Sequence, residues 1–187
     1  MLKLGITNTL YLQQLRVKDS ESVYNLINEN RIHLRTFLNW VDSTRSVRDV
    51  KAFIKGTILD HKKDGSSTFG IRENGRLIGV IGHALLDSLN NSASFGYWIS
   101  QSNEGRGIVT RACRVFLKHS FDSLKLNRLE LCCAVKNLKS EAVAKRLGFR
   151  YEGVRRQGEL VNGEYLDMKV YSMLVDEFNS VRTDKSV

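Results

Sequence analysis

The dipeptide Asn74-Gly75 constrains the fold of this chain more than any other feature, because it stands between two runs of strand-forming residues. Asn-Gly suits the type I′ turn that joins the strands of a two-residue hairpin. Residues 68–72 and 77–85 are therefore predicted to form an antiparallel pair. A polar turn over residues 87–91 leads to a third strand over residues 93–99, so three consecutive antiparallel strands are expected.

Hydrophobic periodicity predicts further strands and helices on both sides of this region. In chain order they are a strand over residues 9–17, a helix from Asp19 or Ser20, a helical pattern over 32–40, a helix over 46–64 opened by a Ser46/Asp49 capping box, a helix from 108 to about 123, a strand over 126–135, a helix over 140–147 stopped by Gly148, and two strands flanking Asn162-Gly163. This order predicts an α/β (α+β) domain, with a mixed central sheet of about seven strands and helices on both faces. We expect one domain over residues 1–178 and a polar C-terminal tail over residues 179–187.

Composition narrows the class of protein. The chain has 187 residues, 42% of them hydrophobic, which suffices for a core without disulfides. Cys113, Cys132 and Cys133 lack zinc-ligand or redox spacing, so we expect no metal and a reducing compartment. Because the sequence contains neither an apolar run of about 18 residues nor a signal-peptide core, we expect no membrane contact and a cytoplasmic location.

The formal net charge of +9 favours a negatively charged partner, since a field of that size steers association. The Lys and Arg residues are scattered along the chain, and no RNA-recognition string occurs. We therefore expect that direct contact with nucleic acid is not required.

The glycines Gly105 and Gly107 lie between a predicted strand and a predicted helix. Unpaired N–H groups at such a helix start, together with the helix dipole, bind phosphate. A glycine turn before a packed helix accounts for the same residues without a ligand. The dinucleotide fingerprint is excluded because Thr110 stands at its third glycine, and no G-K-[ST] string follows a glycine as a nucleotide P-loop needs.

Four motifs in order carry a family resemblance. They are Gly-Tyr-Trp-Ile at 96–99, Glu-Gly-Arg-Gly-Ile at 104–108, Asn-x-x-Ser at 137–140 and Leu-Gly-Phe at 147–149. From about residue 10 to residue 174, the chain resembles the GNAT superfamily of acetyl-CoA-dependent N-acetyltransferases. Within it, the chain is most similar to the branch that acetylates the N-termini of ribosomal proteins, in which a run like that at 156–163 also precedes the last strand.

The resemblance implies a binding site for acetyl-CoA as the co-substrate. The amides of residues 104–109 and the Thr110 side chain are expected to hold the coenzyme A diphosphate, and Arg106 and Arg111 to add charge. The strand end is expected to pair with the pantetheine arm, with the Ile99 N–H facing the thioester oxygen. The implied cofactor-binding residues are Trp98, Ile99, Glu104, Gly105, Arg106, Gly107, Ile108, Val109, Thr110 and Asn137.

The resemblance also implies two catalytic residues, Glu159 as the general base and Ser140 as the general acid. Apart from the resemblance, a solvated hairpin carboxylate explains Glu159 equally well, and an ordinary helix N-cap explains Ser140. Two residues depart from the superfamily pattern, Ser94 and Ser102, which replace a common acidic residue and a common diphosphate contact. Residues 37–40 are expected to shape the acceptor groove.

The branch resemblance implies an acceptor and an assembly. The acceptor is the N-terminal α-amine of an acidic ribosomal stalk protein, attacked directly, and the assembly is a homodimer. Three alternatives stay open from the sequence. They are an acetyltransferase of small amines such as a polyamine or an aminoglycoside, a basic RNA-binding or ribosome-binding domain without catalysis, and an inactive member of the family.

Overall fold

The structure of this protein, a computed structural model, describes residues 2–183. The strands are β1 (Lys3–Gly5), β2 (Leu10–Gln14), β3 (Thr68–Glu73), β4 (Arg76–Asp87), β5 (Ser92–Ile99), β6 (Arg128–Ala134), β7 (Arg150–Val161) and β8 (Glu164–Leu174). The α-helices are α1 (Ser20–Glu29), α2 (Arg31–Leu34), α3 (Val47–Asp64), α4 (Ile108–Lys118), α5 (Leu138–Leu147) and α6 (Val175–Thr183). None of the helices in the described residues combines the length and apolar character that crossing a membrane demands.

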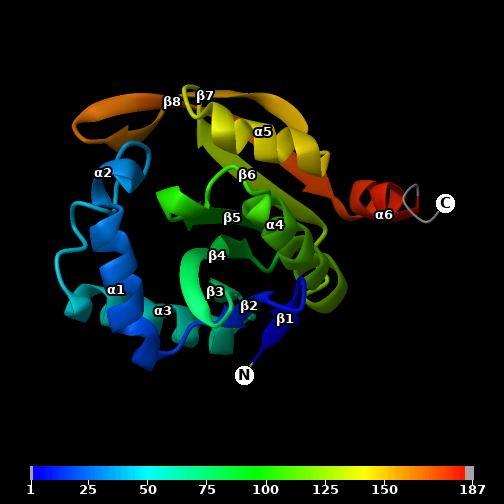
Figure 1. Cartoon of the computed structure of the whole chain (residues 1–187). Coiled ribbons are helices and arrows are strands. Elements are labelled where there is room, and N and C mark those ends of the chain that lie inside the picture. The colour runs from blue at the N-terminus through cyan, green and yellow to red at the C-terminus, as the bar shows by residue number, and fades with distance from the viewer. Residues whose placement is uncertain (1, 184–187) are drawn as a thin grey trace.

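The strands form one sheet in the order β1-β2-β3-β4-β5-β6-β8-β7, as Figure 1 shows. Neighbouring strands are antiparallel, except for the parallel pair β5 and β6. The predicted mixed sheet is confirmed, with eight strands instead of about seven. The additional strand is β1, a short edge strand of three residues that pairs with β2.

Short-range signals fix helix α3 and the central hairpin. The Ser46 hydroxyl accepts a hydrogen bond from the Asp49 N–H, and the Asp49 carboxylate accepts one from the Ser46 N–H, which closes the capping box. Gly65 ends the helix in the left-handed conformation with φ 81°. Asn74 and Gly75 have φ values of 49° and 83°, as a type I′ turn requires. Both predictions are confirmed.

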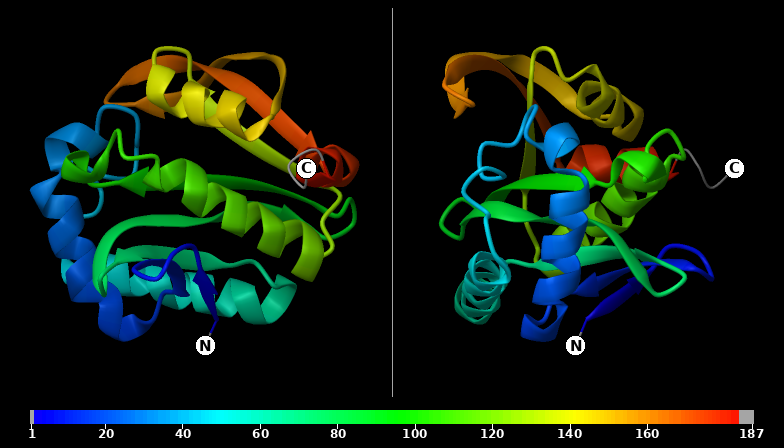
Figure 2. Two further views of the ribbon diagram at one scale, coloured as in Figure 1. Left: turned by 45° about the vertical axis from the view of Figure 1, so that its right-hand side comes forward. Right: turned by 60° about the vertical axis from the view of Figure 1, so that its left-hand side comes forward.

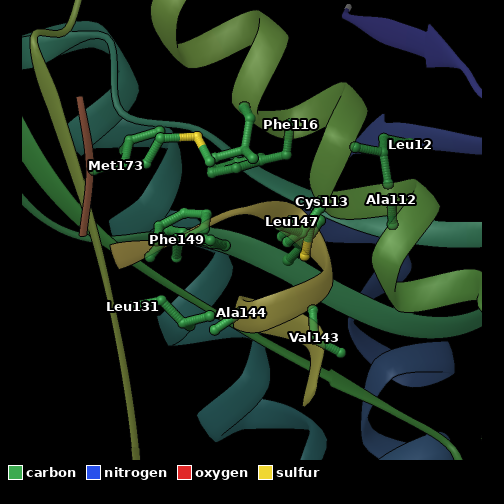
Figure 3. Close-up of a cluster of buried hydrophobic side chains, with 14 of the residues drawn as sticks. Leu12, Ala112, Cys113, Phe116, Leu131, Val143, Ala144, Leu147, Phe149 and Met173 are labelled. Atoms are coloured by element: carbon green, nitrogen blue, oxygen red, sulfur yellow. The ribbon is translucent and has the colours of Figure 1, made fainter. Parts of the chain in front are cut away.

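Helices cover both faces of the sheet, and each face has its own hydrophobic core (Figure 2). On one face, α4 and α5 bring Phe116 and Leu147 against strand residues such as Leu131 and Met173, which Figure 3 shows. On the other face, α1 and α3 pack with Leu15 and with Val80 of β4 around the fully buried Ile54. Each large buried apolar side chain contributes about 1.5–3 kcal/mol through burial.

Two segments differ from the prediction. The helical pattern over residues 32–40 becomes one short helix, α2, because the Arg31 guanidinium donates to the carbonyl oxygens of Val41 and Thr44 and holds the chain in turns. At the other end, residues 179–183 are not part of a tail but continue α6, whose Phe178 ring lies 5.0 Å from the Phe121 ring. The remainder of the predicted tail, residues 184–187, lies outside the described residues.

Candidate active site

A cavity opens where strands β5 and β6 diverge. The two strands pair only through residues 92–94 and 128–130, and the end of β5 pairs with β4 alone. The cavity has a volume of about 1040 Å³. Helix α4 begins after one strand end and helix α5 after the other (Figure 1), so two helix N-termini border it.

Most of the residues that the sequence nominated meet at this cavity. Those that line it are Trp98, Ile99, Glu104, Gly105, Gly107, Ile108, Val109, Thr110, Asn137 and Ser140. Arg106 and Glu159 do not line it. Among the described residues, no group of three or more His, Cys, Asp and Glu side chains is placed to hold a metal ion.

The turn before α4 has the geometry of an anion site. Gly105 and Gly107 have φ values of 72° and 68°, a conformation that other residues adopt only with strain. A Cβ at either glycine would meet no atom within 4 Å, so the backbone is open to a ligand. The first hydrogen bond of the helix runs from the Arg111 N–H to the Gly107 carbonyl, so the N–H groups of Ile108, Val109 and Thr110 have no partner within the helix. This cradle fits a diphosphate.

The charged side chains of the same turn are held by protein partners. The Arg106 guanidinium donates to both Glu73 oxygens and to the Asn103 side chain, which keeps it away from the cavity. The Glu104 carboxylate bridges α2 and α5, with one oxygen 3.2 Å from His33 Nε2 and the other paired with Lys139. Only the backbone of this turn is therefore free for a phosphate.

Ser140 and Asn137 have distinct roles at the start of α5. The Asn137 side-chain oxygen accepts a hydrogen bond from the Ser140 N–H at 3.1 Å, so Asn137 is the helix cap. The alternative that Ser140 is the N-cap is therefore wrong. The Ser140 hydroxyl instead lies 2.8 Å from the Tyr97 hydroxyl, and burial raises the pKa of Tyr97 well above its usual value. Tyr97 thus stays neutral.

Glu159 lies on β7, next to a bulge between Arg155 and Glu159 in the pairing with β8. Burial raises the pKa of its carboxyl group, and the nearby Arg155 partly opposes that rise. In the described part of the chain, no cation lies within ion-pair distance of the carboxylate. A half-buried, unpaired carboxylate of raised pKa is suited to accept a proton.

The other wall of the cavity comes from α2 and the loop after it. Phe37 and Leu38 line the cavity. The Trp40 ring lies 6.1 Å from the ring of Trp98, which also lines the cavity. The tip of the β7–β8 hairpin reaches this loop, because the Asn162 amide donates to the Arg35 carbonyl at 2.7 Å. Figure 1 shows the hairpin arching toward α2. Two of the four residues expected to shape the acceptor groove, Phe37 and Leu38, therefore line the cavity.

Sequence reasoning missed two residues of this site, Tyr97 and Arg146. Tyr97 stands within a quoted motif, but its partner Ser140 is 43 positions away, so no local pattern could pair them. Arg146 lines the cavity from α5 and donates to the Thr110 hydroxyl at 3.0 Å. Its position in the sequence, near the C-terminal end of a helix, is typical of a solvated basic residue.

The comparisons with known proteins agree with this geometry. The Acetyltransferase (GNAT) domain family matches residues 9–150. The ribosomal-protein-serine acetyltransferase of Escherichia coli (strain K12) is 32% identical over 171 residues, which cover 91% of this chain and 96% of that protein.

Two solved structures have the same fold over nearly their whole length. The ribosomal L7/L12 alpha-N-protein acetyltransferase RimL in complex with coenzyme A has a TM-score of 0.90 at 26% identity, covering 94% of this chain and 99% of that one. The microcin C7 self-immunity acetyltransferase MccE, in complex with acetyl-CoA and AMP, has a TM-score of 0.86 at 30% identity, covering 90% and 94%. With the family match over most of the chain, these similarities show that the protein is a member of the GNAT acetyltransferase family.

Proposed function

We propose that this protein transfers the acetyl group of acetyl-CoA to the N-terminal α-amine of an acidic ribosomal protein. The observation that carries the proposal is the match to the Escherichia coli ribosomal-protein-serine acetyltransferase along nearly the full length of both chains. The glycine cradle and the coenzyme A complex of the neighbouring RimL structure support acetyl-CoA as the donor.

Acetyl-CoA, when bound, supplies an acetyl thioester that an amine can attack. The backbone N–H groups at the start of α4 would hold the diphosphate of acetyl-CoA. The end of β5 would pair with its pantetheine arm. An N-terminal amine has a pKa of about 7.7–8.0, against about 10.4 for lysine, so a modest base suffices to free it. Glu159, which does not line the cavity, takes the amine proton through water. As the amine nitrogen bonds to the acetyl carbon, the carbon–sulfur bond breaks.

Ser140 donates a hydrogen bond to the departing sulfur. Its hydroxyl lines the cavity and lies 2.8 Å from the Tyr97 hydroxyl, which positions it there. A donor placed there stabilises the negative charge that develops on sulfur. Tyr97 and Ser140 together therefore form the acid side of the reaction, and Glu159 forms the base side.

The charge of the protein supports an acidic acceptor. With a net charge of +9, the enzyme attracts a negatively charged protein and repels a polyamine, and the rate with an acidic acceptor falls as salt increases. The homodimer implied by the resemblance and the cytoplasmic location expected from the composition of the sequence belong to the same proposal. Light scattering in solution tests the first, and localisation of a tagged protein tests the second.

The deciding experiment measures thiol release from acetyl-CoA with two acceptors in parallel. One acceptor is a peptide that copies the N-terminus of an acidic ribosomal stalk protein, and the other is spermidine. We expect turnover with the peptide and its loss in Glu159→Gln. Turnover with spermidine alone would assign the protein to small amines. Absence of turnover with both, while acetyl-CoA still raises the melting temperature, would refute the acceptor and leave the donor standing.

A further inference from the structure

The turn that begins α4 lacks a cationic side chain for the anion it is shaped to bind. Ser102 replaces a common diphosphate contact of the family, and Arg106 is held by Glu73 and Asn103. Arg111 does not line the cavity, since its guanidinium donates to the Arg106 carbonyl at 3.3 Å. Neither of the arginines expected to add charge therefore supplies it.

An arginine from a different element faces the same turn. Arg146 on α5 lines the cavity, and its guanidinium donates to the hydroxyl of Thr110, in the first turn of α4. Thr110 is 7% exposed, so this contact fixes the guanidinium against the helix start. Among the described residues, no carboxylate lies within ion-pair distance of Arg146. Its charge is uncompensated beside the N–H groups of the cradle.

The other cations around the cavity are differently placed. Lys139 and His33 both contact the Glu104 carboxylate, which compensates them. Lys136 lines the cavity before the start of α5, whereas Arg146 stands near the end of that helix. Arg146 is thus the cation that both lines the cavity and contacts the first turn of α4.

We infer that Arg146 binds the diphosphate of coenzyme A and replaces the cation that the glycine turn lacks. A guanidinium presents several N–H donors in one plane, so it can keep its bond to Thr110 while donating to phosphate oxygens. The inference rests on the proposed donor, and it assigns the anion site to residues from two helices, α4 and α5.

Binding measurements on the full chain test this inference. Isothermal titration compares the wild type with Arg146→Gln, using coenzyme A, dephospho-coenzyme A and pantetheine as ligands. We expect Arg146→Gln to bind the first two at least about 10-fold more weakly, since a hydrogen bond to a charged group is lost, and to bind pantetheine within about twofold of the wild type. Arg146→Lys, which keeps the charge, is expected to retain most of the affinity.

The matched control is Arg114→Gln, which removes the same charge from an exposed position on α4 outside the cavity. It is expected to bind coenzyme A within about twofold of the wild type, and melting temperatures check that all variants fold. The inference is overturned if Arg146→Gln binds coenzyme A normally, or if the loss disappears with dephospho-coenzyme A, which would place Arg146 at the 3′-phosphate. A wild type that binds no coenzyme A would refute the proposed donor instead.

Discussion

The hydroxyl oxygens of Tyr97 and Ser140 lie 2.8 Å apart and link strand β5 to helix α5 inside the cavity. Burial keeps the Tyr97 phenol protonated, so both hydroxyl groups carry a proton and either can donate to the other. We expect Ser140→Ala to lower kcat for acetyl transfer about 100-fold, as loss of a proton or hydrogen-bond donor does. Tyr97→Phe leaves the serine in place without its partner and is expected to lower kcat about 10-fold.

Stopped assays of thiol release measure both effects, and titration with coenzyme A checks that binding stays within about twofold. Tyr151→Phe is the matched control, because its half-exposed ring stacks 5.3 Å from Tyr171 and lies outside the cavity. A Tyr97→Phe variant as active as Tyr151→Phe would show that the tyrosine does not position Ser140.

The pH dependence of kcat/KM is expected to report the protonation of the Glu159 carboxylate. Burial raises its pKa, so the base is lost to protonation at a higher pH than for an exposed glutamate. Arg155→Gln removes the cation that opposes this rise and should move the acidic limb of kcat/KM to higher pH. Arg156→Gln removes the same charge one residue away and serves as the control. Identical acidic limbs in the two variants would contradict the role of Glu159.

The glycine turn is expected to tolerate no side chain at Gly107. Its φ of 68° is strained for alanine by about 1–2 kcal/mol, and the strain falls on the backbone that holds the diphosphate. Gly107→Ala should therefore weaken coenzyme A binding about 10-fold, measured by titration. Gly56 lies in the middle of α3, and the Cβ of an alanine there would meet no atom within 4 Å. Gly56→Ala should therefore stabilise the fold by about 1 kcal/mol and leave binding unchanged. Equal binding by both variants would argue against the cradle.

Elements with a local signal could be predicted from the sequence, and elements fixed by distant contacts could not. The capping box of Ser46 and Asp49 and the Asn74-Gly75 turn each act within four residues, and α3 and the hairpin are confirmed. Strand β1 has three residues without a buried side chain, so its pairing with β2 left no hydrophobic pattern.

The same distinction between local signals and distant contacts holds for the site. The glycine turn is local, and its residues line the cavity. The side chain of Arg106 could not be placed from sequence, because its partner Glu73 lies 33 positions earlier, at the end of strand β3. The pairing of Thr110 with Arg146 likewise joins residues 36 positions apart. Which charge is free and which is compensated is a property of the tertiary structure.

A histidine network outside the cavity ties the residues that follow α4 to strand β4. His83 accepts a hydrogen bond from the Ser67 N–H at Nδ1, and its Nε2 lies 3.0 Å from the Ser120 hydroxyl. The Ser120 hydroxyl in turn donates to a backbone carbonyl. His119 is buried beside Phe69 and contacts Ser67. These contacts suit a neutral His83, since a proton at Nδ1 would face another N–H.

Acid should therefore destabilise the fold through His83. Burial and the neighbouring His119 lower its pKa from 6.5 to about 4, although Asp64 acts in the opposite direction. The unfolded chain takes up the proton first, so the stabilisation is complete above pH 6.5 and is lost as the pH falls toward 4. The loss amounts to about 3 kcal/mol. Urea unfolding across this range should show a weaker pH dependence in His83→Gln, which keeps an acceptor and a donor but does not titrate. Parallel curves for the two proteins would mean that His83 is not the titrating group.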